Sequence, residues 1–223
     1  KLSAMKITKI LITHWHGDHI LGLPGLFLTL GSQKYSGVLE IYGPRGSKEY
    51  LQRVMQVFVP RELVQYKVIE VHSGIFFENG DFFLEAIPLE HSTVCLGYRF
   101  AEKDTRKVNM KALRRIGVDE GPHIKDLQLG KNIVYKGKKI LAKKYTTIAP
   151  GKKISIVTDT LYCQQAINIA KDADILFCES TFLGDLKEQA LERKHMTATQ
   201  AAMIAKKAKV EKLVLIHFSQ RYT

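Results

Sequence analysis

The chain has few cysteines and no long apolar segment. Only three of its 223 residues are cysteines, and they are scattered: Cys95, Cys163 and Cys178. This odd set excludes a disulfide framework and a CxxC metal site. The longest apolar run, residues 20–30, is interrupted by glycine and proline and is too short to span a bilayer. No secretory leader pattern is visible. We therefore expect no membrane association and a reducing, cytoplasmic location.

Acidic residues are in deficit, and the deficit is local. The chain has 34 lysines and arginines against 22 acidic residues, a formal net charge of +12. Residues 103–153 alone hold 15 lysines and arginines against 4 acidic residues. A solvated face is the usual explanation of a charged run, but so local an imbalance favours a polyanionic partner. Nucleic acid comes first and an anionic membrane surface second.

Histidines gather in one short stretch, residues 13–19, with the sequence THWHGDH. The β-branched run 7–12 before it predicts a buried strand, and residues 20–23 after it predict the start of a helix. In an extended chain His14 and His16 point the same way and can reach one metal ion. After a turn at Gly17, Asp18 and His19 can face a second ion. Imidazole with carboxylate suits zinc, with manganese or iron as substitutes.

Further strands are predicted to end in a polar residue. Apolar runs at 82–89, 153–157, 175–178 and 213–216 lead to His91, Asp159, Glu179 and His217. Strands are also predicted at 39–42, 66–71 and 95–100, and helices at 164–170 and 198–208. Thr197 and Gln200 form a capping box for the last helix. Another helix is predicted after a Ser47 cap, continuing to Phe58 and ended by Pro60. Residues 108–116 predict a short basic helix. This alternation indicates an α/β fold.

These motifs resemble the metallo-β-lactamase superfamily, and THWHGDH is most similar to its ribonuclease Z branch. Thr158-Asp159-Thr160 resembles Gly-Asp-Thr, with Thr158 as a departure. The segment 178–181 resembles His-Glu-Ala-Thr, with Cys178 and Ser180 as departures. His195-Met196-Thr197 resembles His-x-Thr, and the segment 217–222 matches His-x-Ser-x-Arg-Tyr.

The resemblance implies a four-layer αββα sandwich, with residues 1–223 as one catalytic domain. The family's first strands are missing before the histidine stretch. A basic flexible arm, residues 103–149 with Gly121-Pro122, is inserted as an exosite. The resemblance assigns RNA contacts to the arm and to the last motif: Lys136, Lys138, Lys139, Lys143, Lys144 and Arg221.

The resemblance also implies two zinc ions per chain. One is held by His14, His16 and His91. The other is held by Asp18, His19 and His217, with Asp159 between the two. Two such ions activate a water and bind the scissile phosphate. Asp18 also aligns the water, and His195 is the general acid, with Glu179 fixing its tautomer. For Glu179, a solvated strand-end carboxylate is the alternative interpretation. His72 and His123 match nothing.

The function implied is a zinc-dependent endoribonuclease that cleaves the 3′ trailer from precursor tRNA and leaves a tRNA 3′-hydroxyl. Two alternatives stay open. One is another hydrolase of the superfamily, acting on a thioester, lactone or cyclic phosphodiester. The other is an inactive, truncated RNA-binding relative. A homodimer is expected, with the first sheet region as its interface.

Overall fold

The computed structural model describes residues 3–57 and 64–222, so Phe58 and Pro60 lie outside the described residues. The chain divides into two compact units. The first consists of Lys1–Asn79, Phe83–Phe100 and Lys153–Thr223, and the second of Gly80–Phe82 and Ala101–Lys152. The predicted arm, residues 103–149, lies within the second unit. Each unit is described separately below.

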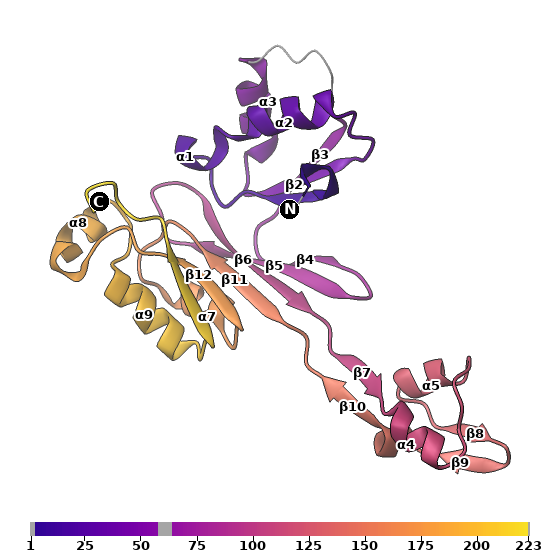
Figure 1. Cartoon of the computed structure of the whole chain (residues 1–223). Helices are drawn as coiled ribbons and strands as arrows, with labels where there is room; N and C mark the ends of the chain where they lie inside the picture. The colour runs from indigo at the N-terminus through magenta and orange to yellow at the C-terminus, as the bar shows by residue number, and fades with distance from the viewer. Residues whose placement is uncertain (1–2, 58–63, 223) are drawn as a thin grey trace. The chain divides into compact units, whose positions relative to one another are not determined.

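A six-stranded mixed sheet forms the centre of the first unit, in the order β13-β12-β11-β6-β5-β4 (Figure 1). β11, β12 and β13 are parallel, whereas β4 and β5 are antiparallel. Its strands are β4 (Gly74–Glu78), β5 (Phe82–Leu89), β6 (Cys95–Glu102), β11 (Lys153–Val157), β12 (Ile175–Glu179) and β13 (Lys212–Ile216). The helical segments near its last strands are α7 (Gln164–Ala170), η2 (Gly184–Leu186), α8 (Lys187–Glu192) and α9 (Ala198–Lys207). Leu176, Ile169 and Ile204, from β12, α7 and α9, are buried in one cluster. Helices α7 and α9 therefore cover this sheet.

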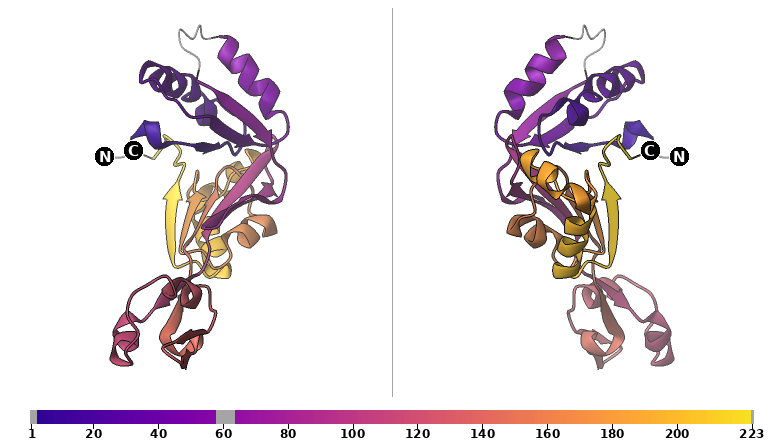
Figure 2. Two further views of the ribbon diagram at one scale, coloured as in Figure 1. Left: turned by 90° about the vertical axis from the view of Figure 1, so that its right-hand side faces the viewer. Right: turned by 90° about the vertical axis from the view of Figure 1, so that its left-hand side faces the viewer.

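A three-stranded parallel sheet, in the order β1-β2-β3, lies in the N-terminal part of the first unit. Its strands are β1 (Lys9–Leu11), β2 (Leu39–Gly43) and β3 (Tyr66–Glu70). The helical segments in this part are η1 (Ala4–Lys6), α1 (Gly17–Ile20), α2 (Leu23–Ser32) and α3 (Ser47–Gln56). Leu30 of α2 and Leu51 of α3 are fully buried against Leu39 and Ile41 of β2. These two helices lie on one face of the sheet, as Figure 2 shows.

The two sheets of the first unit contact each other through β6. The Tyr98 hydroxyl donates to the backbone oxygen of Ile12 at 2.8 Å, and the backbone nitrogen of Leu96 donates to the backbone oxygen of Thr13 at 2.9 Å. Buried Ala86, Leu96 and Tyr98 pack against Leu11 of β1. With helices on the outer faces, the layers are α-β-β-α, as predicted. The chain segment after β1 is thereby attached directly to the larger sheet.

The second unit has a hydrophobic core of its own. Leu113, Val118, Leu127, Ile133 and Ile140 are buried together. Its elements are β7 (Thr105–Val108), α4 (Met110–Arg115), α5 (Ile124–Gln128), β8 (Ile133–Tyr135), β9 (Lys138–Ile140), α6 (Ala142–Tyr145) and β10 (Thr146–Ala149). Strands β7 and β10 pair antiparallel, as do β8 and β9. The predicted arm therefore folds around buried residues of its own.

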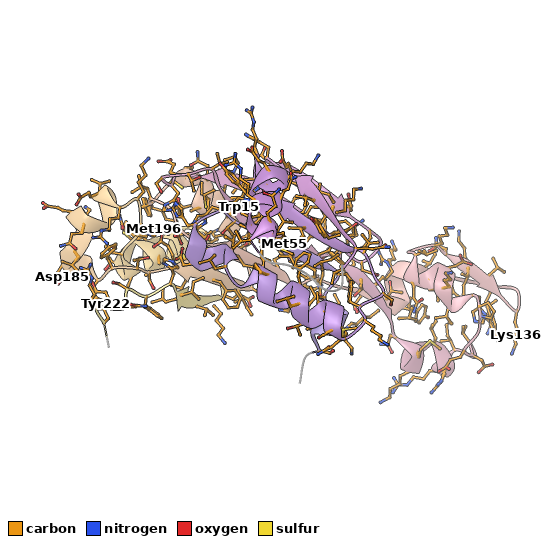
Figure 3. All side chains as sticks on the ribbon, turned by 90° about the horizontal axis from the view of Figure 1, so that it is seen from above. Trp15, Met55, Lys136, Asp185, Met196 and Tyr222 are labelled. Carbon is orange, nitrogen blue, oxygen red and sulfur yellow. The ribbon has the colours of Figure 1, made fainter. Side chains whose placement is uncertain are left out.

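A tight turn joins β8 to β9. Its central residues, Lys136 and Gly137, have φ values of 47° and 77°. Two successive positive φ values are typical of the two-residue turns that match the twist of a hairpin. Lys136 (labelled in Figure 3) is therefore held at the tip of this hairpin, with its side chain exposed.

One local prediction is wrong, and some elements had not been predicted. Ser47 is the first residue of α3 rather than its cap, because Gly46, at φ 94°, takes the cap position. The Ser47 hydroxyl instead donates to the Pro44 oxygen and accepts the indole N–H of Trp15. Strand β4 and helix α8 had not been predicted. Both are short, and exposed residues within them weaken the hydrophobic pattern.

Among the helices in the described part of the chain, none is both long and apolar enough to cross a membrane.

Candidate metal centre

Seven polar residues that follow strands or lie on α1 meet at one place in the first unit. His14 and His16 follow β1, His91 follows β5, Asp159 follows β11, and His217 follows β13. Asp18 and His19 belong to α1, directly after His16. Their ligand atoms form two groups, and within each group all atoms lie within 4.8 Å of one another. The structure thus brings together every residue predicted as a metal ligand, and Asp159 belongs to both groups.

The first group consists of three histidines and Asp159. His16 Nδ1 lies 3.1 Å from His14 Nε2 and 3.2 Å from His91 Nε2. Two nitrogens bound to one tetrahedral zinc at 2.0–2.1 Å would be about 3.3 Å apart. Asp159 Oδ2 lies 3.5 Å from His14 Nε2 and 3.8 Å from His91 Nε2. These separations fit donors arranged around a single ion.

The second group consists of Asp18, His19, Asp159 and His217. Asp18 Oδ2 is 3.3 Å from His19 Nε2 and 3.3 Å from His217 Nε2. Asp159 directs Oδ2 to His19 and Oδ1 to His217, at 3.4 Å each. The Asp159 carboxylate therefore faces both groups, which is the position predicted for a bridging ligand.

The electrostatics of the site favour the protonation states that bind a cation. Burial raises the pKa of Asp159, but the imidazoles of His14, His19 and His217 beside it lower that pKa by more, to well below its usual range. Asp159 is therefore a carboxylate although only 2% of its surface is exposed. Burial lowers the pKa of His91 and of His16, with the charge of His14 adding to the effect for His16. This favours neutral imidazole, the form that donates a lone pair to a metal.

Two buried polar atoms of the site lack a hydrogen-bond partner within the described residues: His19 Nε2 and Asp159 Oδ1. An unsatisfied buried polar atom costs about 1–3 kcal/mol. A bound cation would satisfy both atoms, and the imidazole and carboxylate donors suit a divalent transition metal. The residues present therefore fit a pair of divalent ions.

Outer hydrogen bonds orient several of the histidines. His91 Nδ1 lies 2.9 Å from the backbone oxygen of Lys194, and His14 Nδ1 lies 3.2 Å from Thr13 Oγ1. His217 Nδ1 lies 2.9 Å from Thr181 Oγ1. In each case Nε2 is left facing the donor groups. Such second contacts fix the tautomer and orientation of metal-binding histidines.

Glu179 and His195 form a pair next to the second group. Glu179 is fully buried, and its Oε1 accepts from the backbone nitrogen of Thr160 at 2.7 Å. Its Oε2 accepts from Met196 N at 3.1 Å and from Thr181 Oγ1 at 2.7 Å. His195 Nδ1 lies 3.1 Å from Oε1. The alternative interpretation of Glu179 as a solvated carboxylate is therefore wrong, because every contact is internal to the fold.

The protonated form of His195 is favoured by its surroundings. Burial lowers its pKa, but the hydrogen bond to Glu179 and the negative charges of Glu179, Asp159 and Asp18 raise it by more. The net effect is a pKa above the usual value. The His195 ring also stacks on that of His217, with centroids 5.5 Å apart. His195 is thus a half-buried imidazole at the edge of the donor groups.

Sequence reasoning missed two residues that shape the site, Thr181 and Lys194. Thr181 is two residues after Glu179, so in an extended segment both side chains point the same way, which was the available signal. The contact between Lys194 and His91 joins residues 103 positions apart and leaves no sequence signal. His72 and His123 lie outside both donor groups.

The residues predicted to contact RNA lie in two places. Lys136, Lys138, Lys139, Lys143 and Lys144 are all exposed and belong to the second unit. Arg221 belongs to the first unit, where it donates to Gln189 and Ser219 and lies 5.0 Å above the Phe182 ring. Its guanidinium is thus partly engaged by its own chain. RNA contact by these six residues stays a prediction.

A family model described as a β-lactamase superfamily domain matches residues 1–110 and 144–218. The fold and the two donor groups therefore define a domain of this superfamily. The ribonuclease Z of Nanoarchaeum equitans (strain Kin4-M) is 38% identical over 222 residues, covering 99% of this chain and 70% of that protein. The ribonuclease Z of Bacillus cereus (strain B4264) is 38% identical over 224 residues, covering 97% and 72%. The chain belongs to the ribonuclease Z family.

Solved structures agree with this assignment. Human tRNase Z, short form, superposes with a TM-score of 0.71 and 28% identity, covering 100% of this chain and 76% of that one. A long-form RNase Z from yeast superposes with a TM-score of 0.63 at 16% identity, covering 98% of this chain and 29% of that one. The second likeness supports the fold alone. The predicted metallo-β-lactamase fold is confirmed.

Proposed function

We propose that this chain is a zinc-dependent endoribonuclease that removes the 3′ trailer from precursor tRNA and leaves a tRNA 3′-hydroxyl. The observation that carries the proposal is the Glu179–His195 pair beside seven convergent metal-donor residues, in a chain of the ribonuclease Z family. The donor set alone fits many hydrolases. The adjacent imidazole–carboxylate pair adds an acid–base group of the kind that cleavage at a ribose oxygen requires.

His14, His16 and His91 would hold one ion and Asp18, His19 and His217 the other, with Asp159 shared. Two divalent ions held here would supply a water nucleophile activated near neutral pH and would stabilise charge on the scissile phosphate. Asp18 would also accept a hydrogen bond from the attacking water. Its side chain is 63% exposed, so solvent reaches it.

His195 is proposed as the general acid. A ribose 3′-oxygen is a poor leaving group unless it is protonated. Glu179 accepts the Nδ1–H of His195, so Nε2 is the nitrogen that carries the transferable proton. A pocket of about 270 Å³ opens beside His195, and it is lined by Leu161, Lys187, Glu188, Leu191, His195 and Gln200. This pocket offers space for the nucleotide whose 3′-oxygen leaves.

Zinc at two ions per chain is the proposed native metal, with manganese or iron as substitutes. Three histidines with a carboxylate in one group, and two with two carboxylates in the other, fit the preferences of zinc. Elemental analysis of protein purified without chelator should find close to two zinc ions per chain. No transition metal, with no uptake in a zinc titration, would refute this part.

The second unit is proposed to grip the tRNA through its exposed lysines. It has neither a metal-donor group nor a buried acid–base pair among its described residues.

We also propose a cytoplasmic homodimer formed through the region of the three-stranded sheet. Leu21 and Leu28 in that region are 66% and 46% exposed, which supports an apolar contact there. Analytical ultracentrifugation at several concentrations tests the dimer.

One experiment separates the proposal from the other two readings. The protein is incubated with zinc and a precursor tRNA, and in parallel with a panel of thioesters, lactones and cyclic phosphodiesters. Mapping the products should show a trailer released from the tRNA and a 3′-hydroxyl on the tRNA. Turnover of the panel alone would identify another hydrolase, and RNA binding without cleavage would identify an inactive relative. The Asp159→Ala variant is the control for metal-independent contamination.

A further inference from the structure

The Thr181 hydroxyl lies between three functional side chains. Its Oγ1 is 2.7 Å from Glu179 Oε2, 2.9 Å from His217 Nδ1 and 3.3 Å from His195 Nδ1. Thr181 is itself 8% exposed, so water does not compete freely for these contacts. One hydroxyl thus touches the carboxylate that orients the proposed acid, the acid itself, and a residue of the metal-donor set.

The directions of these hydrogen bonds follow from donor counting. A hydroxyl has one proton to give and lone pairs to accept with, whereas an ionised carboxylate only accepts. Glu179 is the nearest neighbour, so the Thr181 proton goes to Oε2. The oxygen of Thr181 then accepts, and its closest donor is Nδ1–H of His217. His195 Nδ1 is closer to Glu179 Oε1, at 3.1 Å, and donates there.

A continuous chain of hydrogen bonds results, from His217 Nδ1–H to Thr181 and from Thr181 to Glu179. It fixes the Nδ1–H tautomer of His217 and leaves its Nε2 lone pair directed at Asp18 and Asp159. Glu179 is therefore an anchor for His195 directly and for His217 through Thr181.

The frame around this hydroxyl is rigid. The backbone nitrogen of Phe182 donates to Met196 O, and Ala198 N donates to Phe182 O, which ties the segment after β12 to the segment carrying His195. The backbone nitrogen of Ser219 donates to the backbone oxygen of Thr181. His217 has φ 59°, a left-handed conformation that is rare for a residue other than glycine. The surrounding contacts must hold this strained backbone.

We infer that Thr181 is a positioning residue that couples metal binding at His217 to the placement of the proton donor His195. The inference rests on the proposed metal-dependent function and assigns a role to a side chain outside the donor set. The Nδ1 atoms of two other histidines of the donor set have different partners. His91 Nδ1 lies beside the backbone oxygen of Lys194, and His14 Nδ1 lies beside the Thr13 hydroxyl. Within the described chain, neither of these contacts leads to Glu179.

The first test measures metal affinity on substrate-free protein. Thr181→Val keeps the shape and removes the hydroxyl, and Thr181→Ser keeps the hydroxyl. Zinc affinity is measured by competition with a chelator. Loss of the hydrogen bond that orients a metal-binding side chain typically weakens metal binding 10–100-fold. We expect a weakening of that size for Thr181→Val at one of the two ions, and recovery to near wild type for Thr181→Ser.

Ser180→Ala is the matched control. It removes the hydroxyl of the neighbouring residue. That hydroxyl donates to the Ile216 backbone oxygen and not to the Glu179 carboxylate. Its zinc affinity should equal that of the wild type. Wild-type zinc affinity in Thr181→Val, or an equal loss in Ser180→Ala, would overturn the inference.

The second test uses the wild-type protein and holds even if Thr181→Val does not fold. Nitrogen–proton correlation spectra of the zinc-loaded protein report which ring nitrogen of His217 carries hydrogen. The inference requires Nδ1–H, and Nε2–H would refute it. With precursor tRNA, Thr181→Val should lower kcat and leave KM unchanged, with rescue by Thr181→Ser. If the wild type binds zinc with this tautomer but cleaves no tRNA, the proposed function and the proton-donor role of His195 fail, whereas the positioning of His217 by Thr181 stands.

Discussion

The two units of this chain handle charge in opposite ways. In the candidate metal centre two carboxylates are buried beside histidines: Asp159 is 2% exposed and lies against His14 and His19, and Glu179 is fully buried and lies against His195. In the second unit the five lysines predicted to contact RNA are exposed, and the buried core, which includes Leu113 and Leu127, is apolar. Preorganised groups in a site of low dielectric stabilise charge strongly, whereas exposed cations act over a longer range and are screened by salt. The first arrangement suits chemistry and the second suits binding of a polyanion.

This contrast predicts separable kinetic effects. A residue of the metal centre acts on the reacting bond, so its loss should lower kcat. A residue that binds substrate and transition state equally should change KM alone. The four predictions below test this separation, in order of decreasing expected effect.

The largest effect is expected from removing a metal donor. His91→Ala and His217→Ala should each lose bound metal and reduce tRNA cleavage by more than the about 10²–10⁴-fold typical of losing one acid–base group. Metal content by elemental analysis and single-turnover cleavage are the measurements. His72→Ala is the control, because His72 is exposed and outside both donor groups. A comparable loss in that variant would mean that the histidines are wrongly assigned.

Loss of the proposed proton donor should have the next largest effect. His195→Ala should lower kcat by about 10²–10⁴-fold with metal content unchanged, because the leaving oxygen is then protonated only by water. Elemental analysis beside the turnover assay separates the two roles. If the variant loses zinc, His195 is a ligand and not the acid.

The buried carboxylate should matter less than the imidazole that it orients. Glu179→Gln replaces an acceptor of four hydrogen bonds by a group that must also donate, so at least one buried donor loses its partner. We expect about 1–3 kcal/mol of lost stability in urea unfolding and a fall in kcat of about 10–100-fold. Glu192→Gln, at an exposed position in α8, should change neither. An unchanged kcat in Glu179→Gln would remove Glu179 from the mechanism.

The smallest effect on chemistry is expected from the second unit. Alanine at Lys136, Lys138, Lys139, Lys143 and Lys144 should raise KM for precursor tRNA and leave turnover of a small phosphodiester unchanged. Each lost phosphate contact should also flatten the log–log salt dependence of binding by about 0.7–0.9.

The control for this prediction is a variant with alanine at five exposed lysines of the first unit: Lys48, Lys67, Lys171, Lys206 and Lys212. If both variants show the same salt dependence, the second unit is only a solvated surface. If turnover of the small substrate collapses in the second-unit variant, the unit is structural and the proposed tRNA grip fails.

Local structure was largely predictable from the sequence. The strands 82–89 and 153–157 and the helix 164–170 have the predicted bounds, because periodic burial and clear ends define them. Thr197 caps α9 with a complete capping box, as predicted. The Ser47 cap was wrong, because the Trp15 indole, 32 residues earlier, engages its hydroxyl. No local pattern contains that contact.

The core of the second unit was beyond sequence reasoning. Its buried residues are Leu113, Val118, Leu127, Ile133 and Ile140, and their spacing follows neither a helical nor a strand period. Four short elements, α4, α5, β8 and β9, contribute one residue each, and Val118 lies between α4 and α5. Residues this far apart in the chain come together only in the folded unit, in which β7 pairs with β10 and β8 with β9.

The sequence by itself predicted the seven residues that the structure gathers into two donor groups, because each follows a recognisable strand or lies in the histidine stretch. Tertiary structure decided how they combine. The order β13-β12-β11-β6-β5 brings the ends of strands distant in sequence to one site, so Asp159 faces both donor groups. It also buries Glu179 and places the Thr181 hydroxyl between Glu179 and His217. These relations depend on which strands are neighbours, and neighbourhood in a sheet is a property of the folded chain.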